Sequence, residues 1–462
     1  MAAVDLLRKA VDILRGTVDE ADYKSIVLTL LYLHVLSSEF EQWDPLSERV
    51  RNPDQDPVAV LDEMIDAVRR TRRDFAEAIP SASELIGGLE RRRITELFTI
   101  LEDSQGAAVY EDLLAEFARF EGRKGGEFHT PRSVARLLVE ALQPQQGRVY
   151  DPCCGSGGML VQAARFAAEH GGDQAADLAC YGQEINVQSW RLGRMNVDMH
   201  GRLPVELGCA DTLARDLWPS LKADVVLANP PFSMANWARR ASDPRWRYGT
   251  PPSTNANFAW LQHAVDKLSD RGSAGVVLAN GSVSSKQMGE GEIRTAMVED
   301  DVIACIVALP AQLFNSTPIP ACVWILTKDK SSQGSRGLTD RRDQTLFIDA
   351  RAMGELAGRS HRLLTSEELS EIAGVYRAWR GTGRRGEEYK DVPGFCRTAG
   401  LEEIREKRHI LTPGRYVGAA DVDRKRCGGR PDDRLEALTR ELVELLDRSD
   451  HLTERLRRHL DA

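Results

Sequence analysis

The sequence predicts an α/β protein with a doubly wound, mostly parallel β-sheet, an N-terminal helical domain and a C-terminal helical tail. From Arg148 to about Lys328, short apolar runs alternate with helical stretches, as is typical of a parallel sheet that is covered on both faces. Apolar residues at helical spacing dominate the part before this region, and regularly spaced leucines mark the end of the chain. We therefore expect a helical domain (1–120), an α/β core (121–350), a mixed extension (351–430) and a coiled-coil-like helix (431–462).

The composition indicates a globular chain without a membrane span or a disulfide framework. No apolar stretch reaches the ~20 residues that a membrane span needs. The eight cysteines form no CxxC pair, so we expect no metal site and a reducing compartment. The charged, helical start MAAVDLLRKAVDILRG does not resemble a signal peptide, which favours a cytoplasmic protein. The net charge of −9 argues against a dedicated non-specific nucleic-acid binder, so any nucleic-acid contact needs a local basic surface or a partner.

Helical periodicity predicts several helices before the first strand: two near the start of the chain, further helical stretches to about Phe120, and one directly before the strand. The apolar residues are Leu6, Leu7, Ala10, Val11 and Leu14 for the first helix, and Ile26, Leu30, Leu33, Leu36 and Phe40 for the second. A glycine-rich loop, EGRKGG, precedes the last of these helices. There we expect Thr130 as the N-cap and Pro131 at the first helical position. Its apolar face comprises Val134, Leu137, Leu138 and Ala141.

The strands of the core are predicted from apolar runs. These runs are RVYDPCC, LACYGQEI, VELGCAD, ADVVLANPPF, AGVVLANGS, DVIACIVALP and ACVWILTKD. The helical stretches GMLVQAARFAAEH and NVQSWRLGRMNVDMHG separate the first three. Ligands of such sheets bind beyond the carboxyl ends of the strands. The residues directly after each run are therefore the candidate functional residues, whereas residues 329–430 show no clear pattern.

The first motif, DPCCGSGG, links the first predicted strand to a helix. Its glycines permit a tight turn and a close approach of the backbone to a ligand, and free amides at the helix start suit a carboxylate or a phosphate. The sequence lacks the GK[ST] ending of a phosphate-binding P-loop. Asp151 repels a phosphate but attracts an ammonium group. A ligand with an amino-acid end, such as S-adenosylmethionine, carries both an ammonium and a carboxylate; the alternative is an ordinary glycine turn.

Two acidic residues follow the next two predicted strands. Glu184 is placed where a carboxylate can accept hydrogen bonds from a ribose diol; the alternative is a solvated side chain. Asp211 can accept a hydrogen bond from the exocyclic amine of an adenine ring. It can equally act as the N-cap of a helix over TLARDLW, and one residue can do both.

The sharpest motif is Asn229-Pro230-Pro231-Phe232 at the end of the run ADVVLA. The two prolines stiffen the backbone and remove two amide donors. What remains are two acceptors, the Asn229 side-chain oxygen and the Pro230 carbonyl, which can accept both protons of an NH₂ group. Phe232 offers a face on which a planar, extruded base can stack. This motif indicates a site that methylates a planar exocyclic amine, and the alternative is a rigid loop.

These motifs, in this order, resemble those of amino-methylating DNA methyltransferases. More specifically, the chain resembles the modification (M) subunit of type I restriction–modification systems over most of its length. The similar segments are LLRKAVDILRG, YKSIVLTLLYLHVLSSEFE, GGEFHTPRSVARLLVE, NPPF with RWRYGTPPSTNANFAWLQHA, VALPAQLFNSTPIPACVWILTKDK and LTPGRYVG. The resemblance implies a bacterial class I methyltransferase that transfers a methyl group from S-adenosylmethionine to adenine N6 in double-stranded DNA after flipping the base.

The resemblance also implies roles for individual residues. Those that close over the methionine end of the cofactor are Glu127, Phe128, His129, Thr130, Pro131 and Arg132. Those along the glycine loop and the next strand ends are Asp151, Gly155, Ser156, Gly157, Gly158, Glu184 and Asp211. Asn229 to Phe232 hold the flipped adenine. For two residues a structural role stays open, because Phe128 can anchor the following helix and His129 can lie in a surface loop.

The expected partners are double-stranded DNA and a specificity (S) subunit, with two M subunits per S subunit. Whether a restriction (R) subunit joins, and whether the complex serves restriction or a related phage-defence system, stays open. The seam Leu435, Leu438, Leu442, Leu445, Leu452 and Leu456 favours docking of the tail on a partner, and packing on its own domain is the alternative. An amino methyltransferase of RNA or protein and a non-catalytic assembly subunit are the alternative functions.

Overall fold

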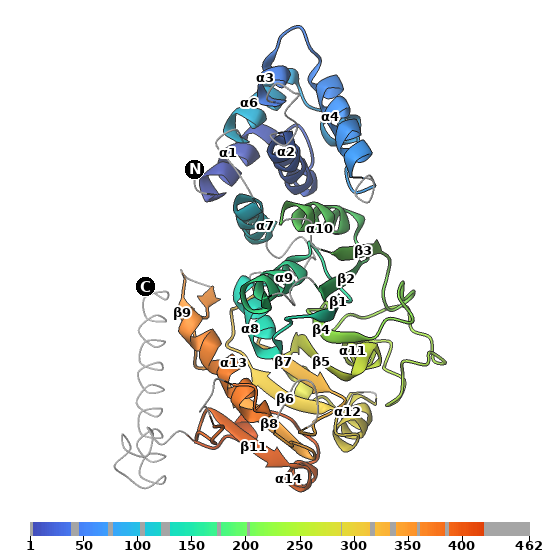
Figure 1. The fold of residues 1–462 in the computed structure, drawn as a ribbon, viewed down its shortest axis with the longest axis vertical. Coiled ribbons are helices and arrows are strands. Elements are labelled where there is room, and N and C mark those ends of the chain that lie inside the picture. Colours follow the sequence, from blue (N-terminus) through green and yellow to red (C-terminus); the bar gives the residue numbers. More distant parts are fainter. Residues whose placement is uncertain are drawn as a thin grey trace, which may run out of the picture.

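A computed structural model shows an elongated molecule with a bundle of helices at one end and a large β-sheet below it (Figure 1). It describes residues 3–37, 46–72, 77–101, 107–121, 130–172, 177–200, 204–287, 289–314, 319–332, 339–357, 361–383 and 388–419. Within these residues, no helix is both long and apolar enough to cross a membrane. They also contain no group of three or more His, Cys, Asp or Glu side chains that could hold a metal, and their seven cysteines are free thiols.

The helical domain packs its amphipathic helices around one apolar core. The helices are α1 (Ala3–Leu14), α2 (Tyr23–Ser37), α3 (Leu46–Arg51), α4 (Pro57–Thr71), α5 (Ala82–Ile86), α6 (Arg91–Leu101) and α7 (Ala107–Glu121). The residues predicted for the face of the first helix are all buried in α1, and Ile26, Leu30, Leu33 and Leu36 are buried in α2. Phe40 lies outside the described residues. Burial of these leucines and isoleucines supplies the main stabilisation of the bundle.

The α/β core is one nine-stranded sheet with the strand order β11-β8-β6-β7-β5-β4-β1-β2-β3. The strands are β1 (Gly147–Asp151), β2 (Leu178–Glu184), β3 (Val205–Cys209), β4 (Ala223–Ala228), β5 (Leu268–Ala279), β6 (Ile303–Ala308), β7 (Ala321–Thr327), β8 (Gln344–Asp349) and β11 (Cys396–Gly400). β1 pairs in parallel with both β2 and β4, so the strand order reverses beside β1. Ligands of doubly wound sheets bind at this switch point.

Helices cover both faces of the sheet, as the fold class requires. On one face lie α8 (Arg132–Leu142), α9 (Gly158–His170) and α13 (Ser366–Arg380), and on the other lie α11 (Asn257–Lys267), α12 (Glu290–Glu299) and α14 (Leu401–Glu406). A small hairpin of β9 (Glu355–Leu356) and β10 (Arg362–Leu363) stands apart from the sheet. The predicted doubly wound, mostly parallel sheet is confirmed.

Helix α10 (Val187–Met199) joins the two parts of the molecule. Leu192 and Met195 on this helix belong to the apolar core of the helical domain. The Tyr32 hydroxyl of α2 donates to Asp198 at 2.8 Å, and the Tyr110 hydroxyl of α7 donates to the Leu192 carbonyl at 3.3 Å. The helical domain therefore packs directly on a helix of the α/β core, and the same helix contacts the glycine loop after β1.

Three features differ from the sequence expectations. β7 runs antiparallel to β5 and β6, although its apolar run resembles those of the parallel strands. β8 and β11 lie in the part of the sequence that showed no clear pattern, and β11 pairs antiparallel with β8 at the sheet edge. The N-cap of α8 is Pro131 rather than Thr130, and the first helical residue is Arg132, because the Thr130 hydroxyl has a different partner, described next.

Candidate active site

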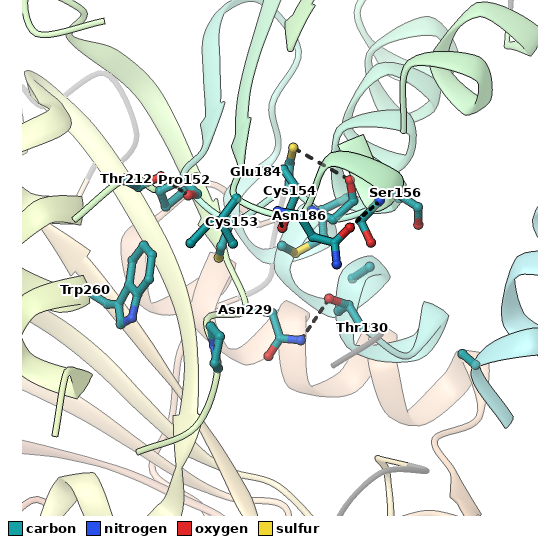
Figure 2. Close-up of a pocket in the computed structure, with 18 of the residues that line it drawn as sticks. Thr130, Pro152, Cys153, Cys154, Ser156, Glu184, Asn186, Thr212, Asn229 and Trp260 are labelled. Atoms are coloured by element: carbon teal, nitrogen blue, oxygen red, sulfur yellow. Dashed lines mark hydrogen bonds between the residues drawn. The ribbon is translucent and has the colours of Figure 1, made fainter. Parts of the chain in front are cut away.

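A cavity of about 690 Å³ lies beyond the carboxyl ends of β1, β2 and β4, at the switch point of the sheet. The predicted site residues that line it are Thr130, Arg132, Gly155, Ser156, Gly158, Glu184, Asp211, Asn229 and Pro231 (Figure 2). Pro131, Asp151, Gly157, Pro230 and Phe232 lie next to lining residues but do not line the cavity themselves. Glu127, Phe128 and His129 lie outside the described residues, so their roles stay predictions.

The glycine loop keeps its backbone open toward the cavity. Gly155 and Gly157 have φ angles of +52° and +75°, a region that L side chains rarely adopt. A Cβ atom added to Gly155 or Gly158 would meet no atom within 4 Å and would project into free space. Gly157 caps the start of α9, whose first backbone amides have no intrahelical acceptor, and the first two helical residues, Gly158 and Met159, line the cavity. The loop therefore forms a cradle that leaves room for a ligand.

Asp151 ends β1 and is fully buried. Its Oδ1 accepts a hydrogen bond from the Cys153 amide at 3.0 Å, and its Oδ2 has no partner among the described residues. Burial, with a further contribution from the charge of Glu184, raises the pKa of this carboxyl to about 8. This pKa leaves the group mostly protonated at neutral pH, and a cation beside the unpaired oxygen would stabilise the ionised carboxylate, which fits the ammonium group expected from the sequence.

Glu184 ends β2, and two backbone amides hold its carboxylate in place. Its Oε2 accepts from Gly155 at 2.9 Å and its Oε1 accepts from Asn186 at 2.8 Å. The first bond ties the glycine loop of β1 to the end of β2. Each carboxylate oxygen has further lone pairs, so the orientation suits acceptance of two hydroxyl donors. The neighbouring Ile185 is 64% exposed and lines the cavity, where it offers an apolar surface beside the carboxylate.

Asp211 follows β3 and shapes a turn. Its Oδ1 accepts from the Leu213 amide at 2.9 Å, which resembles the capping role that the sequence left open. The residues after it form a turn instead of the helix expected over TLARDLW. The Thr212 hydroxyl donates to the Pro152 carbonyl at 2.6 Å and so links the ends of β3 and β1.

Asn229 follows β4 and is 5% exposed. Its Nδ2 donates to the Thr130 hydroxyl at 2.9 Å, whereas its Oδ1 is buried without a partner among the described residues (Figure 2). The Thr130 hydroxyl thus fixes which way the amide is turned. Asn229 Oδ1 therefore remains available as an acceptor for an incoming donor. This is the oxygen that we expected from the NPPF motif to accept a proton of the target NH₂ group.

The other NPPF residues form a stiff loop beside this amide. Pro230 is buried and Pro231 lines the cavity. Phe232 is half-buried and packs edge-on against Phe314, with ring centroids 5.4 Å apart. Cys153 and Cys154 lie close by, and burial raises the pKa of both thiols well above the usual value. Neither is therefore a nucleophile at neutral pH, and both side chains serve packing.

Several lining residues escaped the sequence analysis. Lys24 and Glu111 come from the helical domain, Ser189 and Asn196 from α10, and Trp260 from α11. None of these residues directly follows a predicted strand, and a position directly after a strand was the feature that marked candidate functional residues in the sequence. The Asn196 amide donates to the Ser156 carbonyl at 2.8 Å, and a Cβ on Gly193 would lie 2.9 Å from the Gly155 carbonyl oxygen. Helix α10 therefore sits tightly against the glycine loop.

Glu111 is the centre of an ionic cluster between the helical domain and the core. Its carboxylate lies 3.0 Å from the Arg165 guanidinium, 3.2 Å from that of Arg132 and 3.1 Å from the His200 ring. These partners stand on α9, at the start of α8 and just after α10. Although burial opposes ionisation, the three partners hold the pKa of Glu111 below its usual value.

Two family models match this chain. Residues 102–425 match the model described as N-6 DNA Methylase, and residues 5–119 match the model described as HsdM N-terminal domain. The first match covers the sheet and every lining residue of the cavity except Lys24, and the second covers the helical domain.

Named relatives and solved structures agree with these matches. The chain is 41% identical to the type I restriction enzyme HindI methylase subunit of Haemophilus influenzae over 357 residues, which are 76% of each chain. It is 32% identical to the MjaIX methylase subunit of Methanocaldococcus jannaschii, over 84% of this chain and 67% of the relative. Its fold is similar to that of a type I methyltransferase subunit from Streptococcus thermophilus, with a TM-score of 0.74 at 24% identity, over 90% of this chain and 100% of the other.

Proposed function

This chain belongs to the methylase subunits of type I restriction enzymes, which are N-6 DNA methylases, and from this premise we propose how its cavity binds S-adenosylmethionine and a flipped adenine. The family membership identifies the enzyme as a site-specific, adenine-specific DNA methyltransferase. What remains to be proposed is which residues hold the two reactants and with which partners the chain assembles.

The cofactor cavity fits an amino-acid-bearing nucleoside. Asp151 lies behind the lining residue Pro152, and the charge of its ionised carboxylate would favour an ammonium group at the methionine end. The open backbone at Gly155 and Gly158 leaves space for the ligand to pass along the loop. Glu184 is oriented to accept from the ribose hydroxyls, Ile185 offers a surface for the adenine ring, and Asp211 accepts from its amine. When bound, S-adenosylmethionine supplies an electrophilic methyl group on its sulfonium sulfur.

The NPPF loop prepares the target amine. Asn229 Oδ1 and the Pro230 carbonyl accept the two amine protons, which keeps the nitrogen lone pair out of conjugation with the ring and directs it at the methyl group. After transfer the nitrogen carries a positive charge and releases one of its two protons to water, because the two amide oxygens that hold these protons are hydrogen-bond acceptors and not bases. We assign to Phe232 the stacking of the extruded base. The single observation that carries this proposal is the buried Asn229 amide, whose orientation Thr130 fixes.

Membership of this family also guides the proposal for the substrate and the partners. Arg239 and Arg240 are exposed on the loop after NPPF, next to lining residues Trp237 and Ala238, and give a chain of net charge −9 a local basic surface for DNA phosphates. We propose that a specificity (S) subunit supplies sequence recognition, with two M subunits per S subunit. The tail that we expect to dock on it lies outside the described residues. Co-expression with the S subunit and measurement of the particle mass tests this stoichiometry.

Sequencing of host DNA for N6-methyladenine tests the site assignment. Cells that express the wild-type complex carry the mark at one sequence, and cells that express N229A lose it. Calorimetry with S-adenosylhomocysteine is the control: N229A binds it as the wild type does, which shows that the fold and the cofactor site are intact. Unchanged methylation in N229A would contradict the assignment.

A further inference from the structure

Trp260 on α11 holds a buried hydrogen-bond donor without an acceptor. The side chain is 5% exposed, lines the cavity, and its Nε1 has no partner among the described residues. In the view of Figure 2, Trp260 and Thr130 lie on opposite sides of Asn229. Buried indole N–H groups usually find a partner, because an unmade hydrogen bond is costly. An unpaired donor in the wall of a ligand cavity indicates that the ligand supplies the acceptor.

An indole N–H without an acceptor is not a general feature of the apolar cluster around Trp260, as the two neighbouring tryptophans show. Trp237 Nε1 donates to the Pro252 carbonyl at 3.0 Å, and Trp246 Nε1 donates to the Arg240 carbonyl at 2.7 Å. The two rings pack edge to face, with centroids 5.6 Å apart. Both donors are thus satisfied within the chain, whereas that of Trp260 is not.

The chemistry around Trp260 defines the acceptor. Leu213, Trp237 and Met234 belong to the same apolar cluster and favour a flat, weakly polar ring. The indole nitrogen is covered, so the acceptor comes from a group that inserts against the cavity wall rather than from bulk water. The other unpaired lining atoms, on Asn196 and Asn229, are oxygens that need donors. A ring nitrogen of a purine is a flat acceptor that fits this position.

We propose that the Trp260 indole N–H donates a hydrogen bond to a ring nitrogen of an adenine bound in the cavity, and so contributes to adenine specificity. The inference rests on the proposed function, in which both reactants carry an adenine. Trp260 belongs to one apolar cluster with Leu213, two residues after Asp211, and Met234, two residues after Phe232, so it lies near both proposed adenine sites. The shared chemistry is the purine ring nitrogen, and the experiment distinguishes the two sources.

The first arm measures cofactor binding by calorimetry with S-adenosylhomocysteine and its 1-deaza, 3-deaza and 7-deaza forms. W260F keeps the apolar ring and removes the donor. If the cofactor adenine supplies the acceptor, the wild type binds one deaza form about tenfold more weakly than the parent compound, and W260F binds that form and the parent compound equally. The two other deaza substitutions affect both proteins to the same extent.

The second arm uses the assembled complex and the sequence that host methylation identifies. The target adenine is replaced in turn by 1-deaza-, 3-deaza- and 7-deazaadenine. If the target base supplies the acceptor, one replacement raises the KM of the wild type for DNA about tenfold and leaves the KM of W260F unchanged. In that case the deaza forms of S-adenosylhomocysteine show no such difference between the two proteins.

W246F is the matched control, since it removes an indole donor whose acceptor lies within the chain and whose side chain does not line the cavity. W246F lowers the melting temperature and leaves both deaza patterns as in the wild type. W260F lowers the melting temperature less than W246F does, because both variants lose buried ring area but only W246F loses a hydrogen bond within the described chain.

Two outcomes overturn the inference. If wild type and W260F respond in parallel to every deaza form in both arms, Trp260 donates to neither adenine. If W260F fails to fold, the wild-type series decides, because indifference to every deaza form in both arms contradicts the proposal. A wild-type chain that does not bind S-adenosylhomocysteine contradicts the proposed function as well, so the two failures are distinguishable.

Discussion

At the scale of single residues, Thr130 shows how one hydroxyl can set the chemistry of a neighbour. An asparagine amide presents either an oxygen or an NH₂ group to a ligand, and the bond from Asn229 Nδ2 to the Thr130 hydroxyl selects the oxygen. Thr130 is thus a positioning residue. A threonine before a proline and an apolar periodic run usually signals an N-cap, which is why the sequence predicted that role for Thr130.

T130V tests this positioning role. Valine has the same shape but cannot accept the amide proton, so Asn229 loses its fixed orientation and kcat falls about tenfold to a hundredfold, while S-adenosylhomocysteine affinity stays within about twofold. T130S keeps the hydroxyl and restores kcat. Equal activity of T130V and the wild type, measured as methyl transfer by the assembled complex, would show that the orientation of Asn229 does not depend on Thr130.

Asp151 gives a prediction for the pH dependence of stability. Its pKa is raised from 3.8 to about 8 in the folded chain, mainly by burial. Between about pH 4 and about pH 8 the folded state therefore binds one proton more than the unfolded state, and its stability falls as the pH rises, by up to about 1.4 kcal/mol per pH unit. D151N removes this titration and can still accept from the Cys153 amide.

Urea unfolding of wild type and D151N across this pH range checks the prediction. The difference in unfolding free energy between D151N and the wild type increases from about pH 5 to about pH 8, in favour of D151N. A difference that stays constant over the range would contradict the raised pKa of this carboxyl.

The residues of the site were predictable where a short motif carries the chemistry. Asp151 and Glu184 end strands and Asn229 directly follows one, and the parallel sheet brings strand ends together. Trp260 and Asn196 were not predictable in this way, since they stand inside helices among ordinary core positions. Only the three-dimensional packing shows that one face of each helix meets the cavity.

At the scale of elements, helix α10 links the glycine loop to the helical domain. Gly193 lies so close to the loop that a Cβ would approach the Gly155 carbonyl oxygen to 2.9 Å, a backbone atom that cannot move without moving the loop. We predict that G193A weakens S-adenosylhomocysteine binding about tenfold and lowers the unfolding free energy by about 1–3 kcal/mol. Calorimetry and urea unfolding measure the two effects.

G374A is the control for the intrinsic effect of replacing a helical glycine. Gly374 lies inside α13, and a Cβ there would come no closer than 3.9 Å to another atom, the end of the flexible Arg377 side chain. Since alanine restricts the unfolded chain, G374A raises stability by about 0.4–1 kcal/mol and leaves cofactor affinity unchanged. If G193A behaved like G374A, the close packing of α10 on the loop would not be needed for binding.

The elements that the sequence predicted least well share a physical cause. β7 enters the sheet antiparallel between β5 and β6, and a fully buried strand has the same apolar composition in either direction. β11 at the sheet edge, CRTAG, carries only a few apolar residues and has no periodic signal. Direction and edge position depend on partners far away in the sequence, which a local pattern does not encode.

At the scale of the whole molecule, the cofactor cavity belongs to two domains. Lys24, Glu111, Leu114 and Ala118 of the helical domain line it together with the strand ends of the core. Glu111 connects these parts through partners on three elements of the core, and one of them, Arg132, starts the helix that follows Thr130. If the cavity holds the cofactor as proposed, cofactor binding is coupled to the packing of the helical domain.

E111Q tests this coupling. The substitution keeps the size of the side chain but removes the negative charge that Arg132, Arg165 and His200 share. We therefore expect the unfolding free energy to fall by about 1–3 kcal/mol, and S-adenosylhomocysteine to bind several-fold more weakly. In hydrogen-exchange mass spectrometry, the cofactor protects α7 and α8 in the wild type, and this protection is reduced in E111Q. E96Q is the control, because Glu96 pairs with Arg92 on the exposed side of α6 and its loss changes stability by no more than about 0.5 kcal/mol. If E111Q and E96Q gave the same cofactor affinity and the same protection of α7, the helical domain would form a wall of the cavity without contributing to binding.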